Sequence, residues 1–344
     1  MNAAKVTDLE YIDFLVASPH VVSCTEAARV QPDGPRRAAH DAVTRLLHRL
    51  EPDPTPLWEE AQQHVNLEDG LLILDDTTLD KPYAQQIELV HRHWSGKHHK
   101  VVEGINLVTL LWSDGIHAVP CDYRVYDKPV DGLTKNAHVL TMLSTAHKRG
   151  FHPKLVAFDS WYSGLENLKA VRSYGWRWLT RLKSNRLVNP DGLGNRPLRE
   201  LAEIIAEYGT RVHLKGYGFI VVFRIDTPDG DTEYWASSDL EMTMHEREQL
   251  AGQIWTIETY HRGLKQFCGV ERCQVRAARA QRNHIGWSIR AFLRLEHHHI
   301  CTGKSWFATK LDIIRPALQL YLSQPSPILY GFIQYPASLN PSTA

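Results

Sequence analysis

The sequence lacks the features that define several large classes of protein. No apolar run approaches the roughly 20 residues that span a bilayer, and acids are scattered through the first residues, so we expect neither a membrane span nor a signal peptide. The five cysteines form no Cys-x-x-Cys pair, which argues against a disulfide framework and a zinc site. Internal repeats and low-complexity tracts are absent as well. These absences favour a folded protein of the cytoplasm.

The formal net charge is zero, but acidic and basic residues are distributed unevenly along the chain. The 344 residues include 39 Lys and Arg against 39 Asp and Glu. Residues 1–70 hold six bases and twelve acids, whereas residues 169–224 hold eleven bases and four acids. A basic surface on a neutral chain favours a polyanion that binds at one face. Ordinary solvated charge is the alternative.

Residues 1–68 have a helical pattern. Thr25 is a candidate N-cap, a Pro-Asp-Gly-Pro break follows, and apolar residues recur at helical spacing from Val43 to Leu50. Two helices with a break between them predict a possible helix-turn-helix that binds DNA. A plain helical bundle is the alternative.

The rest of the chain divides into four regions. Residues 69–185 alternate strand and helix signals, which predicts the first part of an α/β core. Residues 186–244 are rich in strand signals, and residues 245–300 contain helices with many bases. We expect a C-terminal helix and a frayed tail over residues 301–344.

Three acids stand out by their position. Asp76 and Asp159 each follow a short apolar run that predicts a buried strand, and Glu258 lies on a predicted helix. A charge at the end of a buried strand is costly unless it is paired or bound to metal. Three converging carboxylates would suit Mg²⁺ or Mn²⁺. Turn formation by each Asp is the simpler alternative.

Bases follow Glu258 on the same helix face. Arg262 and Lys265 lie four and seven residues later, within about 40° of Glu258 around a helix. With Arg272 and Arg276, which we expect on the same helix, they are candidates to hold the phosphate backbone of a nucleic acid. An ion pair between Glu258 and Arg262 is the alternative.

Three motifs in this order resemble those of DDE transposases of bacterial insertion sequences, and most closely the insertion sequence 4 and 701 groups. "ILDDTT" resembles the first-Asp motif, and the acid directly before Thr-Thr is Asp76. "AFDSWYSG" resembles the second motif and gives Asp159. "WTIETYHRGLK" resembles the third and gives Glu258, with the family's lysine at Lys265. The β-rich region 186–244 resembles the strand insertion of this group.

The chain departs from the family signature at two positions, and two neighbouring aspartates are candidates for the first catalytic acid. The family signature expects Tyr and Arg seven and four residues before the Glu, where this chain has Ala251 and Ile254. Those residues handle the transposon end in the family, so Tyr260 and Arg262 are candidates to replace them, and Trp255 fits the pattern as a DNA contact. Asp75 competes with Asp76, because neighbours on a strand point to opposite faces and only one can enter the site.

The resemblance implies an RNase H-like core, in which a mixed sheet is flanked by helices. It implies a transposase that binds terminal inverted repeats, cleaves the transposon ends and joins the 3′ ends to target DNA. Two Mg²⁺ or Mn²⁺ ions would be held by Asp76, Asp159 and Glu258. The partners would be double-stranded DNA and a second copy of the chain on that DNA, at the nucleoid of a bacterial cytoplasm. A metal-dependent nuclease without strand transfer, or a domesticated transposase that only binds DNA, are the alternatives.

Overall fold

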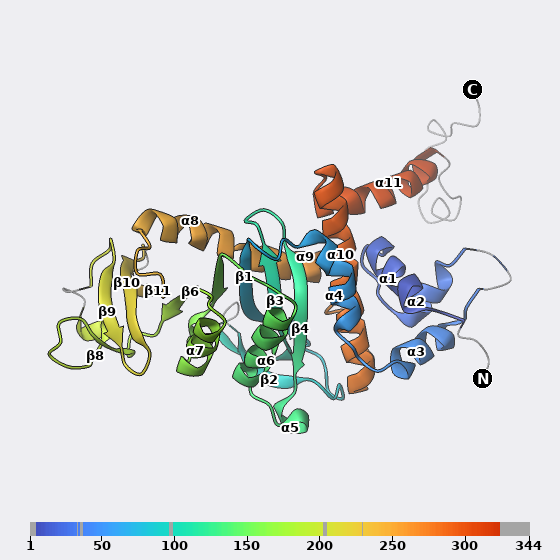
Figure 1. Cartoon of the computed structure of the whole chain (residues 1–344). Coiled ribbons are helices and arrows are strands. Elements are labelled where there is room, and N and C mark those ends of the chain that lie inside the picture. Colours follow the sequence, from blue (N-terminus) through green and yellow to red (C-terminus); the bar gives the residue numbers. More distant parts are fainter. Residues whose placement is uncertain are drawn as a thin grey trace, which may run out of the picture.

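One mixed sheet organises the molecule. The computed structural model describes residues 5–32, 34, 37–95, 99–201, 205–228 and 230–323. Its strands form a single sheet with helices packed around it, so the predicted α/β class is confirmed (Figure 1). The strands are β1 (Leu71–Asp80), β2 (His91–Ser95), β3 (Lys100–Ser113), β4 (Val119–Tyr126), β5 (Leu155–Phe158), β6 (Trp178–Leu182), β7 (Leu187–Asn189), β8 (Arg196–Pro197), β9 (Thr210–Leu214), β10 (Gly218–Asp226) and β11 (Thr232–Ser237).

The helices fall before, between and after the strands. Helices α1 to α4 precede the sheet, α5 to α7 connect its central strands, and α8 to α11 follow the last strand. They are α1 (Asp8–Ala17), α2 (Cys24–Arg29), α3 (His40–Arg49), α4 (Thr55–Ala61), α5 (Lys128–Asp131), α6 (Lys135–Lys148), α7 (Leu165–Ser173), α8 (Met244–Ile254), α9 (Thr256–Phe267), α10 (Ala278–Thr302) and α11 (Trp306–Ser323). Within the described residues, none of these helices combines the length and the apolar character needed to cross a membrane.

The strand order separates a central part from an added part. Strand β3 pairs with both β4 and β2, and the sheet continues through β1, β5 and β6. Strand β1 is antiparallel to β3 but parallel to β5, and β5 is parallel to β6. Strands β11, β10, β9, β7 and β8 then extend the sheet beyond β6, so the β-rich stretch of the sequence does form strands.

The register between β1 and β5 aligns two acids. Leu71 to Leu74 of β1 pair in parallel with Leu155 to Phe158 of β5. Both apolar runs are buried, since a parallel pair in the middle of a sheet is covered on both faces. Leu74 lies opposite Phe158, so the next residue on each chain is Asp75 on one and Asp159 on the other. Paired positions point to the same face of a sheet.

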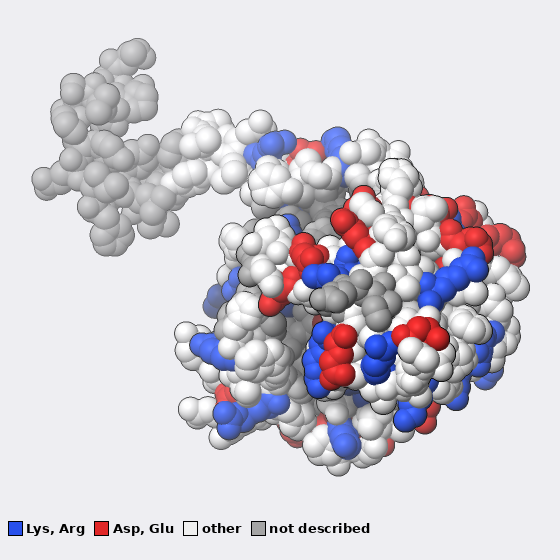
Figure 2. Space-filling view, turned by 90° about the vertical axis from the view of Figure 1, so that its left-hand side faces the viewer, with Lys and Arg blue, Asp and Glu red and all other residues white. Residues whose placement is uncertain are grey.

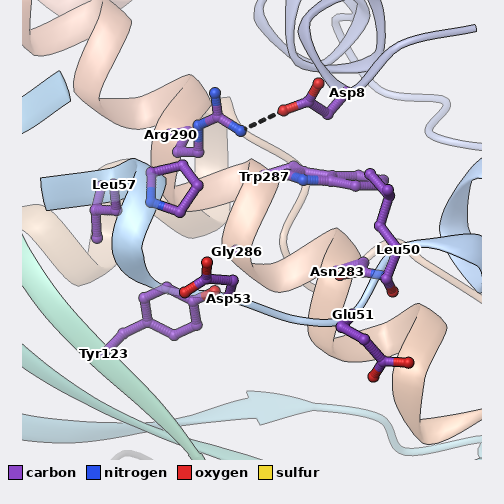
Figure 3. A pocket seen from close by; sticks show the side chains of 11 residues that line it. Asp8, Leu50, Glu51, Asp53, Leu57, Tyr123, Asn283, Gly286, Trp287 and Arg290 are labelled. Atoms are coloured by element: carbon purple, nitrogen blue, oxygen red, sulfur yellow. Dashed lines mark hydrogen bonds and ion pairs between the residues drawn. The ribbon is translucent and has the colours of Figure 1, made fainter. Parts of the chain in front are cut away.

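The N-terminal helices are joined to the rest of the molecule by buried polar contacts. Arg290 of α10 is 7% exposed and pairs at 2.6 Å with both Asp8 of α1 and Glu60 of α4. Asn283 of α10 donates hydrogen bonds to backbone carbonyls at Leu47 and Leu50. Figure 3 shows Arg290 directed toward Asp8 at the edge of a cavity of about 220 Å³. These contacts make the N-terminal helices part of one packed body.

The possible helix-turn-helix has a long connection. Residues 30–39 separate α2 from α3, whereas a helix-turn-helix uses a turn of roughly three to four residues. Part of the Pro-Asp-Gly-Pro break, at positions 33 and 35, lies outside the described residues, as does the predicted tail at 324–344. The DNA-binding role of this region stays a prediction.

Candidate active site

Asp159 occupies the turn that follows β5. Four buried apolar residues form that strand, and Asp159 begins the short 3₁₀ helix at Ser160–Tyr162. Its side chain accepts a hydrogen bond of 2.6 Å from the backbone N–H of Trp161, as expected for an aspartate at a helix start. The carboxylate is exposed at the end of the sheet. The sequence-based placement of Asp159 at a strand end is therefore confirmed.

Three acids line one cavity beside this turn. The cavity has a volume of about 290 Å³ and is bordered by Asp75 from β1, Asp159, and Glu258 from α9. Apolar side chains surround them, among them Ile257 and Trp255. The register described above explains why Asp75 accompanies Asp159. The cavity therefore contains two of the three predicted acids, Asp159 and Glu258, and it contains Asp75 instead of Asp76.

Asp76 lies in a different environment. One oxygen of its carboxylate accepts hydrogen bonds from Asn106 at 2.6 Å and from Lys135 at 2.8 Å. The other oxygen accepts one from the hydroxyl of Tyr162. Lys135 belongs to α6, whereas the cavity is bordered by α9, so Asp75 and Asp76 turn to opposite faces as neighbours on a strand do. The expected convergence of Asp76 with Asp159 and Glu258 in one cavity is not what the structure shows.

The pKa values of the two neighbouring aspartates are shifted in opposite directions. Burial raises the pKa of Asp75 well above its usual value, and the nearby charges of Asp76, Asp159 and Glu258 add to the rise. Burial also acts on Asp76, but Lys135, Asn106 and Tyr162 outweigh it and hold the pKa of Asp76 below its usual value. The negative charge of Asp76 is therefore compensated within the protein, whereas Asp75 lies near other acids.

Glu258 projects from the polar side of an amphipathic helix. Ile257, Tyr260 and Leu264 form the buried stripe of α9, and Glu258 is exposed. The helix packs against β1, which places Glu258 at the cavity. Ala251 and Ile254, the positions at which the resembling family has Tyr and Arg, also border the cavity.

The carboxylates fit a hard divalent cation by their chemistry. Mg²⁺ and Mn²⁺ prefer oxygen ligands, and three carboxylates on one cavity supply them. As the side chains are placed, no three His, Cys, Asp or Glu residues in the described part of the chain are close enough to hold an ion together. The donor set is therefore suitable in its chemistry, and the side chains of Asp159 and Glu258 are exposed.

The predicted DNA contacts differ in how accessible they are. Trp255 is 61% exposed at the cavity, and Arg262 is exposed without a hydrogen bond or ion pair to the described residues. Lys265 instead donates a hydrogen bond of 2.8 Å to the carbonyl of Thr78 and pairs with Glu271 at 3.4 Å. Lys265 is therefore engaged inside the protein.

Three other expectations for this region need correction. Tyr260 has an exposed fraction of 0%, so its predicted contact with DNA is wrong. Arg272 and Arg276 do not continue the helix of Glu258, because α9 ends at Phe267 and α10 begins at Ala278. Both arginines are exposed in the connecting loop. They stay available to a polyanion, but from a loop.

No pattern in the sequence predicts that residues of β6 and β11 line the cavity. Arg181 of β6 and Glu233 and Trp235 of β11 line the cavity. Arg181 pairs with Glu233 at 2.7 Å and lies 5.7 Å from the ring of Trp235. Only the pairing of β6 with β11 brings these residues to Asp159, and no local motif predicts that long-range pairing.

The excess of bases between residues 169 and 224 does not produce a uniform basic surface. Figure 2 looks onto the end of the molecule that carries the added strands and shows Lys and Arg interspersed with Asp and Glu. Acids from elsewhere in the chain and from the region itself pair with these arginines, in Arg177–Asp239, Arg181–Glu233, Arg196–Asp191, Arg211–Glu241 and Arg224–Asp226. The prediction of a polyanion site from that count is weakened at this face.

Comparison with known proteins supplies a family and a fold. Residues 5–200 match the family model described as DDE superfamily endonuclease. A solved piggyBac transposase synaptic complex with hairpin DNA is similar at 13% identity and a TM-score of 0.51, over 98% of this chain and 76% of that chain. The Mos1 strand transfer complex is similar only at 10% identity and a TM-score of 0.20, over 52% and 58%. No curated protein sequence matches.

Proposed function

This chain belongs to the DDE superfamily endonucleases, and from that premise we propose that it is a transposase. It binds terminal inverted repeats, cleaves the transposon ends and joins the freed 3′ ends to target DNA. The observation that carries the proposal is the cavity bordered by Asp75, Asp159 and Glu258. The order of the acids along the chain, on strand, strand and helix, is the order that the resemblance to insertion-sequence transposases implies.

The catalytic core in this proposal is RNase H-like. Strands β4, β3, β1, β5 and β6 form the central sheet, with an antiparallel half and a parallel half that meet at β1. The acids lie where β1 and β5 run side by side, and α9 lies against β1. The strands that follow β6 are the insertion that the insertion sequence 4 and 701 groups carry before their glutamate.

The site would hold two Mg²⁺ or Mn²⁺ ions. When bound, such ions activate an attacking water or 3′-hydroxyl and stabilise the leaving oxygen of a phosphodiester. Asp159 and Glu258 would hold them, together with one of the neighbouring aspartates. The family motif favours Asp76, as the acid directly before Thr-Thr, whereas the cavity favours Asp75. We propose Asp75, because Asp76 is already compensated by Lys135.

The substrate in the proposal is double-stranded DNA. Arg262 and the loop arginines Arg272 and Arg276 contact phosphates in this proposal. All three are exposed, and all three follow Glu258 in the sequence. Trp255 contacts the DNA at the cavity. Two transposon ends must be brought together for the reaction, so the resemblance implies two copies of the chain on the DNA. We propose that the protein works in a bacterial cytoplasm, at the nucleoid when it is bound to DNA, as the resemblance implies.

One reaction separates this function from its alternatives. The purified chain is incubated with Mg²⁺, a supercoiled target, and duplexes that carry the inverted repeats flanking its own gene. Joined products support the transposase, and cut but unjoined ends indicate a nuclease. Binding without cleavage would show that the chain is only a DNA-binding protein. Asp159→Asn is the control, because it removes a charge from the cavity and keeps the shape of the side chain.

A further inference from the structure

Asp76 joins two backbone segments that carry acids of the site. It follows Asp75 directly on β1, and its carboxylate accepts a hydrogen bond from the hydroxyl of Tyr162. Tyr162 ends the 3₁₀ helix that Asp159 begins. The contact therefore connects the strand that carries Asp75 to the turn that carries Asp159, on the face of the sheet away from the cavity.

The carboxylate of Asp76 accepts hydrogen bonds from three side chains, although Asp76 does not line the cavity. Lys135 and Asn106 donate to the same carboxylate oxygen, and Asn106 is 1% exposed. Lys135 is the first residue of α6, where a positive charge is unfavourable beside the helix dipole. Its pairing with Asp76 offsets that cost, so Asp76 is held in one orientation from both sides.

Tyr162 is fixed from its backbone side as well. Asn167, which is 1% exposed, donates a hydrogen bond of 2.9 Å to the carbonyl of Tyr162. Arg186 donates one of 2.8 Å to the carbonyl of Ser163. The turn after Asp159 is therefore anchored at its end, and the hydroxyl of Tyr162 adds the tie to β1.

We propose that Tyr162, Asp76 and Lys135 form a brace that fixes the separation of Asp75 and Asp159 and so sets the affinity of the site for divalent metal. The inference rests on the proposed function, because it takes the cavity to be a metal site. These three are positioning residues, since none of them needs to touch the metal or the DNA. The brace also gives the second aspartate of the "DD" pair a role of its own.

Groups that orient metal ligands have a characteristic effect when they are removed. Losing one typically weakens metal affinity or activity by about 10–100-fold while the ligands stay in place. Tyr162→Phe deletes the single hydroxyl that contacts Asp76 and keeps the ring. We therefore expect Mn²⁺ to bind the full-length variant about 10-fold more weakly, with the maximal cleavage rate largely recovered at saturating Mn²⁺.

The test is a calorimetric titration of Mn²⁺ into the wild type and the variants, with the melting temperature of each measured alongside. Tyr217→Phe is the matched control, because its hydroxyl accepts a buried hydrogen bond of 2.9 Å from Trp178 away from the cavity. Weaker Mn²⁺ binding in Tyr162→Phe alone supports the brace. Equal affinity in the two tyrosine variants would overturn it.

A double-mutant cycle keeps the proposal testable if one variant is unstable. If Tyr162 and Asp76 act as one unit, Asp76→Ala and the double variant should each bind Mn²⁺ about as weakly as Tyr162→Phe, because coupled residues are not additive. Complete loss of binding in Asp76→Ala alone would mean that Asp76 is a ligand, and would overturn the brace. Asp159→Asn distinguishes failure of the brace from failure of the proposed metal site. Unchanged Mn²⁺ binding in that variant refutes the metal site itself.

Discussion

Lys265 and Arg262 follow Glu258 on one helix, yet the structure predicts different roles for them. The ammonium group of Lys265 donates to the carbonyl of Thr78 on β1 and lies near Glu271. The guanidinium of Arg262 is exposed and has no partner within the described residues. We predict that Lys265→Ala lowers stability and leaves DNA binding nearly unchanged, whereas Arg262→Ala does the reverse.

The magnitudes follow from the contacts that each substitution removes. A hydrogen bond from a charged group contributes about 1.5–3 kcal/mol, and the partly exposed ion pair with Glu271, at 3.4 Å, adds little. Lys265→Ala should therefore lower the free energy of unfolding by about 2 kcal/mol, which corresponds to about 3 °C in Tm at this chain length. One lost phosphate contact at Arg262 should flatten the plot of log binding constant against log salt by about 0.9.

The assay measures binding to duplex ends at several salt concentrations, with Tm recorded for each variant. Arg294→Ala is a useful comparison, since its exposed partner Asp13 gives an ion pair of small value. The reasoning is refuted if Lys265→Ala flattens the salt dependence while its Tm stays at the wild-type value. It is refuted equally if Arg262→Ala leaves the salt dependence unchanged.

Three further predictions concern other parts of the molecule. Arg290→Met removes a buried cation and leaves its partly exposed partners Asp8 and Glu60 unpaired, so it should lower the free energy of unfolding by about 2–3 kcal/mol in urea titrations. A smaller loss than in an exposed-arginine variant would refute the docking of the N-terminal helices. Burial lowers the pKa of His284 to about 3. Below about pH 6.5 the unfolded state therefore takes up a proton that the folded state does not, and the free energy of unfolding decreases as the pH is lowered. His284→Gln should lose about 1 kcal/mol less than the wild type between pH 7 and 5.5, and an equal loss would contradict that assignment. Trp255→Ala should weaken binding to DNA ends by about 1–3 kcal/mol with Tm unchanged, as for an exposed aromatic that stacks on a base; unchanged binding would remove Trp255 from the interface.

The sequence predicted the elements of the site better than the orientation of side chains within it. A buried strand ending at Asp159 and a helix carrying Glu258 were both visible as short patterns. The predicted strand end at Asp75 and Asp76 was wrong, because β1 continues past both residues to Asp80. The choice between Asp75 and Asp76 was not visible in the sequence, because the apolar run before them is buried on both faces and shows no alternation. Only the register of β1 with β5, a long-range property, identifies Asp75 as the neighbour of Asp159.

Two other differences have distinct physical causes. The burial of Tyr260 could have been predicted, since Ile257, Tyr260 and Leu264 recur at the spacing of a helix core stripe. The engagement of Lys265 could not, because its partner is a backbone carbonyl on a distant strand. Helical periodicity identifies the face of a residue but not what the opposing element presents to it.

The most direct test of the metal site compares four single substitutions in the same two assays. Asp75→Asn, Asp159→Asn, Glu258→Gln and Asp76→Asn are each tested for Mn²⁺ binding by calorimetry and for cleavage of the element's own ends, with Tm to verify folding. We predict that the first three abolish both, whereas Asp76→Asn binds Mn²⁺ more weakly, by about 10-fold, and cleaves at saturating metal. Full loss in Asp76→Asn together with near-normal binding and cleavage in Asp75→Asn would contradict the assignment of the cavity as the active site.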